Sequence, residues 1–183
     1  MVKITFDIET TGLNPLFSKI TCICGKATLG NDYMGSHTNE KGLITDFLKW
    51  LKKENVEELI SANGKEFDLP FIFMRAYILG IDFKEVSFLK ELKNFDVIND
   101  ITDRRISLNN LARLYGFELK SGSGTNAIKL FEDMKLDELM DYCMDDVLLT
   151  EKVYLKYNEG VKDDGGFWNS NSTSLSYGAD NMR

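Results

Sequence analysis

Several features that would place this chain outside the soluble globular class are scarce in its sequence. It has two prolines in 183 residues and 43% hydrophobic residues, which argues against extensive disorder. It has no run of about 18 apolar residues, and its start shows no charged region followed by a hydrophobic stretch. Neither membrane insertion nor secretion is indicated, and we expect a folded cytoplasmic protein whose length favours a single domain.

Cysteine and histidine, the residues that most often bind zinc, are also scarce. The three cysteines, Cys22, Cys24 and Cys143, lack Cys-x-x-Cys spacing, and the single histidine, His37, cannot complete a convincing zinc set. We therefore expect the cysteines to be reduced, buried thiols.

Positive charge is in deficit, with 22 Lys and Arg against 29 Asp and Glu and a net charge of −7. This balance argues against a nucleic-acid-binding protein that coats phosphates with clustered basic side chains. The objection weakens if acidic side chains hold metal, because two divalent cations would bring the net charge from −7 to −3. Such ions would also reverse the sign of the local field at their site.

The pattern of apolar residues predicts an α/β domain with a mixed sheet. The strands expected from β-favouring runs are 2–8, 19–29, 33–34 and 59–62, of which the first three would form an antiparallel meander. The helices expected from apolar spacing and caps are 39–53 (capped by Thr38 or Asn39), 68–79, 107–115, 127–133 and 137–157. Residues 81–103 fit a strand, short helices or both.

The polar composition after Glu159 predicts a boundary between a folded domain and a tail. Residues 1–159 would form the domain, and residues 160–183, rich in Gly, Asn and Ser, would form a loose tail. Phe167 and Trp168 are the side chains that could dock this tail.

Two acidic residues lie at the end of the first predicted strand. Spacing of two on a strand sends the side chains of Asp7 and Glu9 to one face, where they can share a site. Such like charges repel unless a cation neutralises them. An Asp-x-Glu pair alone is more often the solvated face of an edge strand, so the flanking sequence FDIETTGL at residues 6–13 decides the interpretation.

A second acidic segment, NGKEFDLPF at residues 63–71, places Asp68 between a strand end and the first turn of a helix. An acid there can project into a crevice at the edge of a sheet, although an ordinary helix-capping Asp is the simpler alternative.

The third segment is DYCMDDV at residues 141–147. Spacing of four puts Tyr142 and Asp146 on one face of a helix, and Asp145 could also face that way. The alternative is a packed tyrosine beside an exposed acid.

These segments resemble, in chain order, the three motifs of the DEDD superfamily of exonucleases. The first is similar to the motif shared by polymerase proofreading domains, and the second to the Asn-x-x-x-Phe-Asp form of family B DNA polymerases. The Tyr-x-x-x-Asp pattern of the third resembles the DEDDy subgroup and selects Asp146 over Asp145. His37 lies far from it, which argues against the sister class that uses histidine there. The resemblance covers residues 4–150.

The resemblance implies a ribonuclease-H-like fold and a metal-dependent 3′→5′ exonuclease acting on single-stranded DNA, with RNA as an open alternative. It implies that Asp7 bridges two Mg²⁺ or Mn²⁺ ions, that Glu9 and Asp146 complete one of them, and that Asp68 supports the other. Because the ordinary pKa of tyrosine is about 10, Tyr142 is a poor general base and is expected to orient the attacking water.

The resemblance also implies substrate contacts, at Thr10, Thr11, Leu13, Asn63 and Phe67. Leu13 would wedge near the terminal base and Phe67 would line the path of the strand, so sequence preference should be weak. Core packing is the alternative for both. Scattered basic residues could contact phosphates, namely Lys65, Arg104, Arg105, Arg113 and Lys120.

Two other functions stay open at this point: an inactive exonuclease fold used as a binding module, and a ribonuclease or endonuclease on the same fold. The chain has no room for a polymerase domain, so we expect it to act alone or in trans with a polymerase or another replication or repair protein. No membrane partner is expected.

Overall fold

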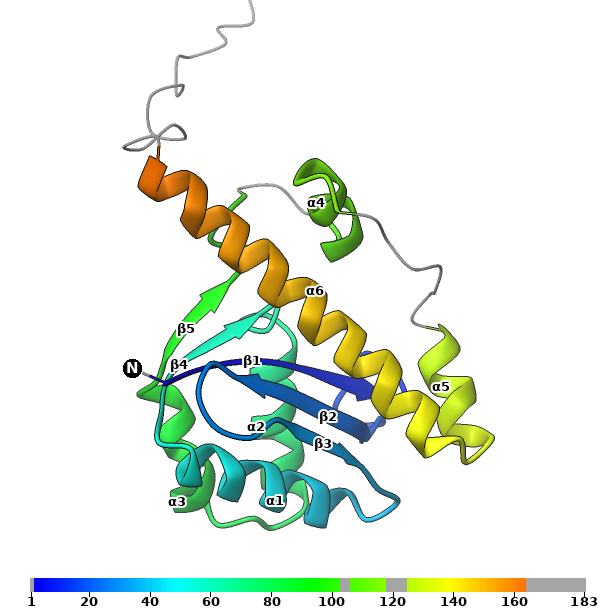
Figure 1. Ribbon diagram of the computed structural model, residues 1–183. Helices are drawn as coiled ribbons and strands as arrows, with labels where there is room; N and C mark the ends of the chain where they lie inside the picture. The colour runs from blue at the N-terminus through cyan, green and yellow to red at the C-terminus, as the bar shows by residue number, and fades with distance from the viewer. Residues whose placement is uncertain (1, 103–105, 118–124, 164–183) are drawn as a thin grey trace, which may run out of the picture.

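The structure, a computed structural model, describes residues 2–102, 106–117 and 125–163. A five-stranded sheet with the order β3-β2-β1-β4-β5 runs through it (Figure 1). The strands are β1 Val2–Thr10, β2 Ile20–Ala27, β3 Tyr33–Ser36, β4 Val56–Ser61 and β5 Lys93–Asp96. The first three strands pair antiparallel, while β4 and β5 are parallel to β1, which confirms the predicted meander and mixed sheet.

The helices follow the predicted pattern closely, with one region newly resolved. They are α1 Glu40–Lys53, α2 Asp68–Ile78, α3 Phe83–Val86, the 3-10 turn η1 Ser87–Lys90, α4 Leu108–Leu114, α5 Thr125–Glu132 and α6 Leu136–Asp163. The side chain of Asn39 accepts a hydrogen bond from the backbone N–H of Gly42 at 3.2 Å, so Asn39 and not Thr38 caps α1. The undecided region 81–103 contains α3, η1 and β5.

The end of the chain is only partly described. Helix α6 continues to Asp163, past the predicted helix end at 157 and past Glu159, so the division into a domain and a tail stays a prediction. Phe167 and Trp168 lie outside the described residues.

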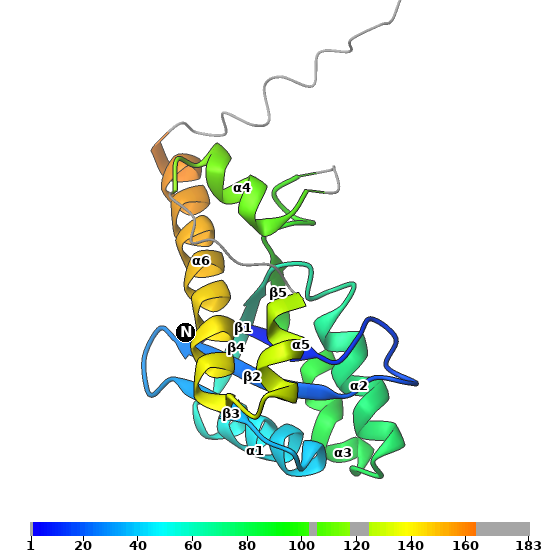
Figure 2. The ribbon, with the colours of Figure 1, turned by 90° about the vertical axis from the view of Figure 1, so that its right-hand side faces the viewer.

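Helices cover both faces of the sheet. Helix α2 lies on one side of it and α6 crosses the other, as the view in Figure 2 shows. Alternation along β1 sends Ile4, Phe6 and Ile8 into the core shared with α1 and α2. The side chains of Asp7 and Glu9 consequently point to the face that α6 covers.

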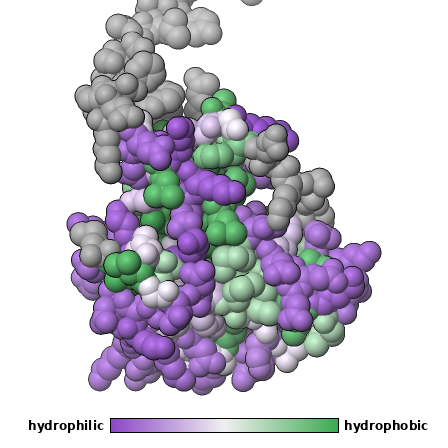
Figure 3. Space-filling view, viewed as in Figure 1, coloured by the Kyte–Doolittle hydropathy of each residue, from purple (hydrophilic) through white to green (hydrophobic). Residues whose placement is uncertain are grey.

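The surface is polar over most of the face shown in Figure 3, and hydrophobic side chains gather near its centre. Among the described helices, none combines the length and apolar character that crossing a bilayer would require.

Candidate active site

Strand β1 extends beyond the part that pairs with β4, and this unpaired edge lies at the site. β4 pairs with β1 only from Val2 to Thr5, whereas the pairing with β2 continues to Thr10. Beyond Thr5, one edge of β1 is therefore available to side chains from elsewhere. Asp68 occupies it, since its Oδ1 accepts a hydrogen bond from the backbone N–H of Ile8 at 3.2 Å.

The contacts of Asp68 decide whether it is a site acid or an ordinary helix-capping residue. Asp68 is the first residue of α2 and is 3% exposed, and the residue at the N-cap position, Phe67, makes no capping hydrogen bond through its side chain. The Asp68 carboxylate reaches across to β1, between the two acids of that strand, and so does more than cap its own helix.

Asp7 and Glu9 lie together on the α6 face of the sheet. Their carboxylate oxygens and the Cys143 sulfur fall within 4.8 Å of one another. Helix α6 adds Asp146, whose charge acts on both Asp7 and Glu9, and Tyr142, which feels the charges of these three acids. Four acids from β1, α2 and α6 are thus brought into mutual electrostatic range.

The pKa of every one of the four carboxyls is raised, and burial is the first cause in each case. Burial, followed by the charges of Asp68 and Glu9, places the pKa of Asp7 well above its usual range. Burial, followed by the charge of Asp146, raises the pKa of Glu9 to about 8. Burial raises the pKa of Asp68 to about 7, and burial with the charge of Asp145 raises the pKa of Asp146 to about 6.

The donor set fits divalent cations. Four carboxylates that are costly to ionise together become favourable when positive charge joins them, and an all-oxygen set suits Mg²⁺ or Mn²⁺. Burial, then the charges of Asp146 and Glu9, raise the pKa of Tyr142 above its usual range, so its hydroxyl stays protonated near neutral pH.

A buried acid outside the three motifs, Asp96, positions the segment that leads to Asp68. Asp96 ends β5 and is fully buried. Its carboxylate accepts hydrogen bonds from the backbone N–H groups of Asn63 at 2.8 Å and Lys65 at 3.0 Å. It also accepts one from Ile98 at 3.0 Å. The only sequence signal for this role is an acid directly after the apolar Phe95, in a region where the strand itself was undecided.

The loop after β1 holds the exposed side chain predicted to act as a wedge. Leu13 is 85% exposed, so core packing does not explain it. The Thr10 hydroxyl donates to the carbonyl oxygen of Gly12 at 2.8 Å, and the Thr11 hydroxyl accepts from the backbone N–H of Lys19 at 3.0 Å. Both threonines therefore shape the loop that presents Leu13.

A buried ion pair anchors the same loop to the body of the domain. Arg75 donates to the carboxylate of Glu40 at 2.7 Å and to the carbonyl oxygen of Pro15 at 2.9 Å. Glu40 in turn accepts from the backbone N–H of Ile20 at 2.8 Å.

Phe67 and the predicted phosphate contacts are placed less favourably for substrate. Phe67 is half-buried and packs against Phe71, with ring centroids 5.3 Å apart, which favours the core alternative. Lys65 forms an ion pair with Asp100 at 2.6 Å, while Arg113 is exposed. The other three basic residues, Arg104, Arg105 and Lys120, lie outside the described residues.

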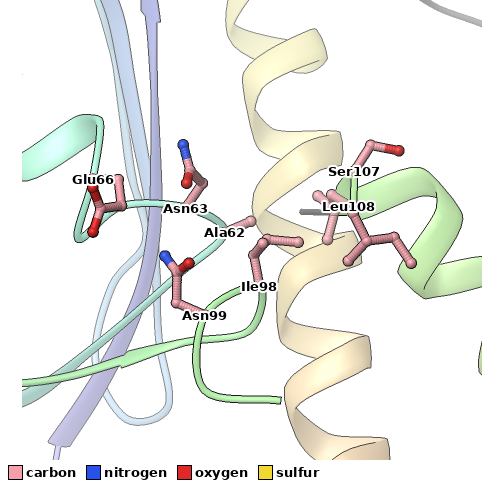
Figure 4. Close-up of a pocket in the computed structure, with 8 residues that line it drawn as sticks. Ala62, Asn63, Glu66, Ile98, Asn99, Ser107 and Leu108 are labelled. Carbon is pink, nitrogen blue, oxygen red and sulfur yellow. The ribbon is translucent and has the colours of Figure 1, made fainter. Parts of the chain in front are cut away.

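A cavity of about 780 Å³ opens beside the second motif. Figure 4 shows Asn63 and Glu66 on one side of it and Ser107 and Leu108, at the start of α4, on the other. Asn63, a predicted substrate contact, therefore faces a space large enough for part of a nucleotide chain.

Comparisons with known proteins agree with this architecture. Residues 4–158 match the family described as the RNase_H superfamily. The family B DNA polymerase from the hyperthermophilic archaeon Pyrobaculum calidifontis is structurally similar with a TM-score of 0.72 and 19% identity, over 88% of this chain and 24% of the polymerase chain. The predicted ribonuclease-H-like fold is confirmed.

A curated protein is similar in sequence over part of the chain. An uncharacterized protein of Methanocaldococcus jannaschii is 38% identical over 77 residues, which is 42% of this chain and 42% of the relative. The chain thus matches less than half the length of both relatives.

Proposed function

The chain belongs to the RNase H superfamily, and we propose on that basis that it is a metal-dependent 3′→5′ exonuclease of the DEDDy type. It removes nucleotides from the ends of single-stranded nucleic acid, DNA in preference to RNA. The observation behind the proposal is the convergence of Asp7, Glu9, Asp68 and Asp146 from three elements, close enough that the charges of Asp68 and Asp146 raise the pKa values of Asp7 and Glu9. Phosphodiester hydrolysis by two metal ions requires such an all-acid cluster.

In this proposal the four carboxylates would hold two ions, Mg²⁺ or Mn²⁺, and such ions would supply an activated water near neutral pH and charge stabilisation for the leaving oxygen. Asp7 is the central ligand, because the other three acids all act on it. The hydrogen bond from Ile8 fixes Asp68 before any ion binds. The protonated hydroxyl of Tyr142 orients the attacking water by donating a hydrogen bond.

Substrate contacts follow from the surroundings of these acids. The exposed Leu13 wedges near the terminal base, and Asn63 contacts the strand along the cavity that Ser107 and Leu108 close on the far side. Such contacts read any base, so the preference for sequence is weak. The similar fold in a family B DNA polymerase makes a polymerase, or another replication or repair protein, the favoured partner.

Digestion of 5′-labelled single-stranded DNA with Mg²⁺ or Mn²⁺ tests the proposal. We expect a ladder shortened from the 3′ end, abolished by Asp7→Ala and Asp146→Asn. Asp145→Asn is the matched control, since it removes one charge from the adjacent position of α6, and it should change the ladder little. No metal-dependent turnover by folded wild-type protein would favour the inactive binding module.

Two further substrates distinguish the remaining alternatives. An exonuclease needs an end, so closed circular DNA should stay intact, and its cleavage would indicate an endonuclease. Labelled RNA degraded faster than DNA of the same sequence would indicate a ribonuclease on this fold.

A further inference from the structure

All three cysteines of the chain meet beside the candidate active site, although Cys143 is far from Cys22 and Cys24 in sequence. Cys22 and Cys24 lie on β2, directly across from Glu9 and Asp7 of β1, and Cys143 reaches them from α6. The three sulfur atoms fall within 4.8 Å of one another, and each residue is fully buried. None forms a disulfide, and the proposed reaction uses none of them.

The spacing of the sulfurs suits a thiophilic cation. In a tetrahedral Zn²⁺ site with bonds of about 2.3 Å, two sulfur ligands lie about 3.8 Å apart. The sulfurs of Cys22 and Cys24 are 3.8 Å apart. Cys143 lies within 4.8 Å of both, so ligation needs a shift of only about 1 Å by its side chain. Thiolates select Zn²⁺ or Cu⁺, whereas Mg²⁺ and Mn²⁺ prefer oxygen.

A fourth ligand lies next to one of the three thiols, that of Cys143. The Oδ2 atom of Asp7 lies 3.8 Å from the sulfur of Cys143. Carboxylate oxygens bind Zn²⁺ alongside cysteine and histidine ligands. On the side away from the acids the thiols pack with apolar side chains, among them Leu139 and Val147 of α6.

We propose that Cys22, Cys24 and Cys143 form a binding site for one thiophilic cation of the Zn²⁺ class, completed by Asp7. Binding releases the thiol protons to water. Because the thiols are buried, the ion enters during folding or slowly afterwards. A cation held there draws the Asp7 carboxylate toward the thiols and competes with Mg²⁺ or Mn²⁺ for it. This inhibitory consequence rests on the proposed function, whereas the binding site does not.

Cadmium binding in a large excess of Mg²⁺ and a non-thiol reductant tests the site. The ultraviolet charge-transfer band between sulfur and Cd²⁺ reports thiolate ligation only, so Cd²⁺ bound by carboxylates alone gives no band. We expect the band to saturate at one Cd²⁺ per chain after long incubation. Protein produced in zinc-supplemented medium should retain one Zn²⁺ per chain by plasma mass spectrometry.

Near-isosteric variants provide the controls. Cys143→Ser should weaken Cd²⁺ binding by more than about a hundredfold, because changes that only adjoin a metal ligand already cost about 10–100-fold. Asp7→Asn should keep the band with weaker affinity, since it retains all three thiols. Circular dichroism checks folding, and Cys24→Ser replaces Cys143→Ser if the latter is unfolded.

The outcomes separate this proposal from the nuclease proposal. The thiol site is overturned if wild-type protein shows no charge-transfer band with Cd²⁺ and also retains no Zn²⁺ after production in zinc-supplemented medium. It is also overturned if a folded serine variant shows an unchanged band. A Mg²⁺-dependent ladder alongside that result would leave the nuclease standing. Cadmium binding without any ladder would do the reverse.

Discussion

Asp68 combines two functions in one side chain, and substitution can separate them. Its carboxylate supplies charge to the acid cluster and also accepts the backbone N–H of Ile8. Asparagine keeps the accepting oxygen but removes the charge. Alanine removes both, which leaves a buried N–H without a partner at a cost of about 1–3 kcal/mol.

We therefore expect Asp68→Asn to be at least as stable as the metal-free wild type near pH 8, because it removes a buried carboxyl whose pKa is raised to about 7. It should lose more than about a hundredfold in kcat/KM. Asp68→Ala should lose the same activity and be about 1–3 kcal/mol less stable than Asp68→Asn. Urea unfolding and initial rates on single-stranded DNA measure the two quantities. An active Asp68→Asn would remove this residue from the metal site.

The raised pKa values of the site predict how stability depends on pH in the absence of metal. An acid whose pKa is higher in the folded than in the unfolded state binds protons more tightly when folded. Its contribution to stability is greatest below its unfolded pKa, about 4, and is lost as the pH rises to its folded pKa. With folded values of about 6 for Asp146, about 7 for Asp68 and about 8 for Glu9, the window runs from about pH 4 to pH 8.

In EDTA we expect Tm to fall between pH 5 and pH 8 and Mg²⁺ to restore it at pH 8. Glu9→Gln should flatten this fall, because it removes the group that titrates highest among the three values above. Asp137→Asn, an exposed acid at the start of α6, is the control and should leave the slope unchanged. Differential scanning calorimetry across the range measures it, and a Tm that rises toward pH 8 in EDTA would contradict the assignment.

At the scale of elements, local patterns predicted the structure wherever the signal lies within the element itself. Helix α1 has its apolar stripe within its 14 residues and its cap, Asn39, directly before them, and β1 shows its two faces by alternation. Strand β5 has only four residues, beginning with Lys93, and it forms by pairing with β4 far away in sequence. No local pattern carries that pairing, so Asp96 at its end could not be assigned.

The contribution of β5 to the site is testable through that acid. Asp96→Ala should cost about 1–3 kcal/mol of stability, since it leaves the buried N–H of Ile98 and the partly buried N–H of Asn63 without their acceptor. It should also reduce kcat/KM, because the loop it fixes leads directly to Asp68. Urea unfolding and initial rates measure both effects.

Asp100→Asn provides the matched control for this change. Asp100 lies in the same region but is exposed, and its ion pair with Lys65 is partly solvated, so its loss should cost less than about 1 kcal/mol. A larger loss for Asp100→Asn than for Asp96→Ala would show that the loop is not held by the buried acid.

At the scale of the whole molecule, the motifs identified the acids but not what surrounds them. The order of three segments along the chain predicted a shared site for Asp7, Asp68 and Asp146. The thiol cluster and the cavity beside α4 depend on how α6 crosses the sheet and where α4 packs, and both are contacts between distant segments. The spacing of residues within one segment does not predict such contacts, so nothing in the sequence indicates that Cys143 lies beside Cys22 and Cys24.

If the chain acts on nucleic acid as proposed, its net charge of −7 predicts an unusual salt dependence. Each phosphate neutralised by Lys or Arg adds a slope of about −0.7 to the log-log salt dependence of single-strand binding. Lys65 is already paired with Asp100, so we expect ions at the acid cluster to supply most of the attraction. The KM for a single-stranded oligonucleotide at fixed Mg²⁺ should therefore rise with KCl at a log-log slope below about 1.5.

Initial rates over a range of KCl concentrations measure this slope. A slope steeper than about 3 would mean at least about four basic contacts, and Arg104→Ala, Arg105→Ala and Lys120→Ala would then show where they lie. A shallow slope combined with loss of binding in EDTA would identify the metal ions as the main attraction for the phosphate backbone. An acidic protein can then act on an acidic polymer because its carboxylates recruit the cations that both require.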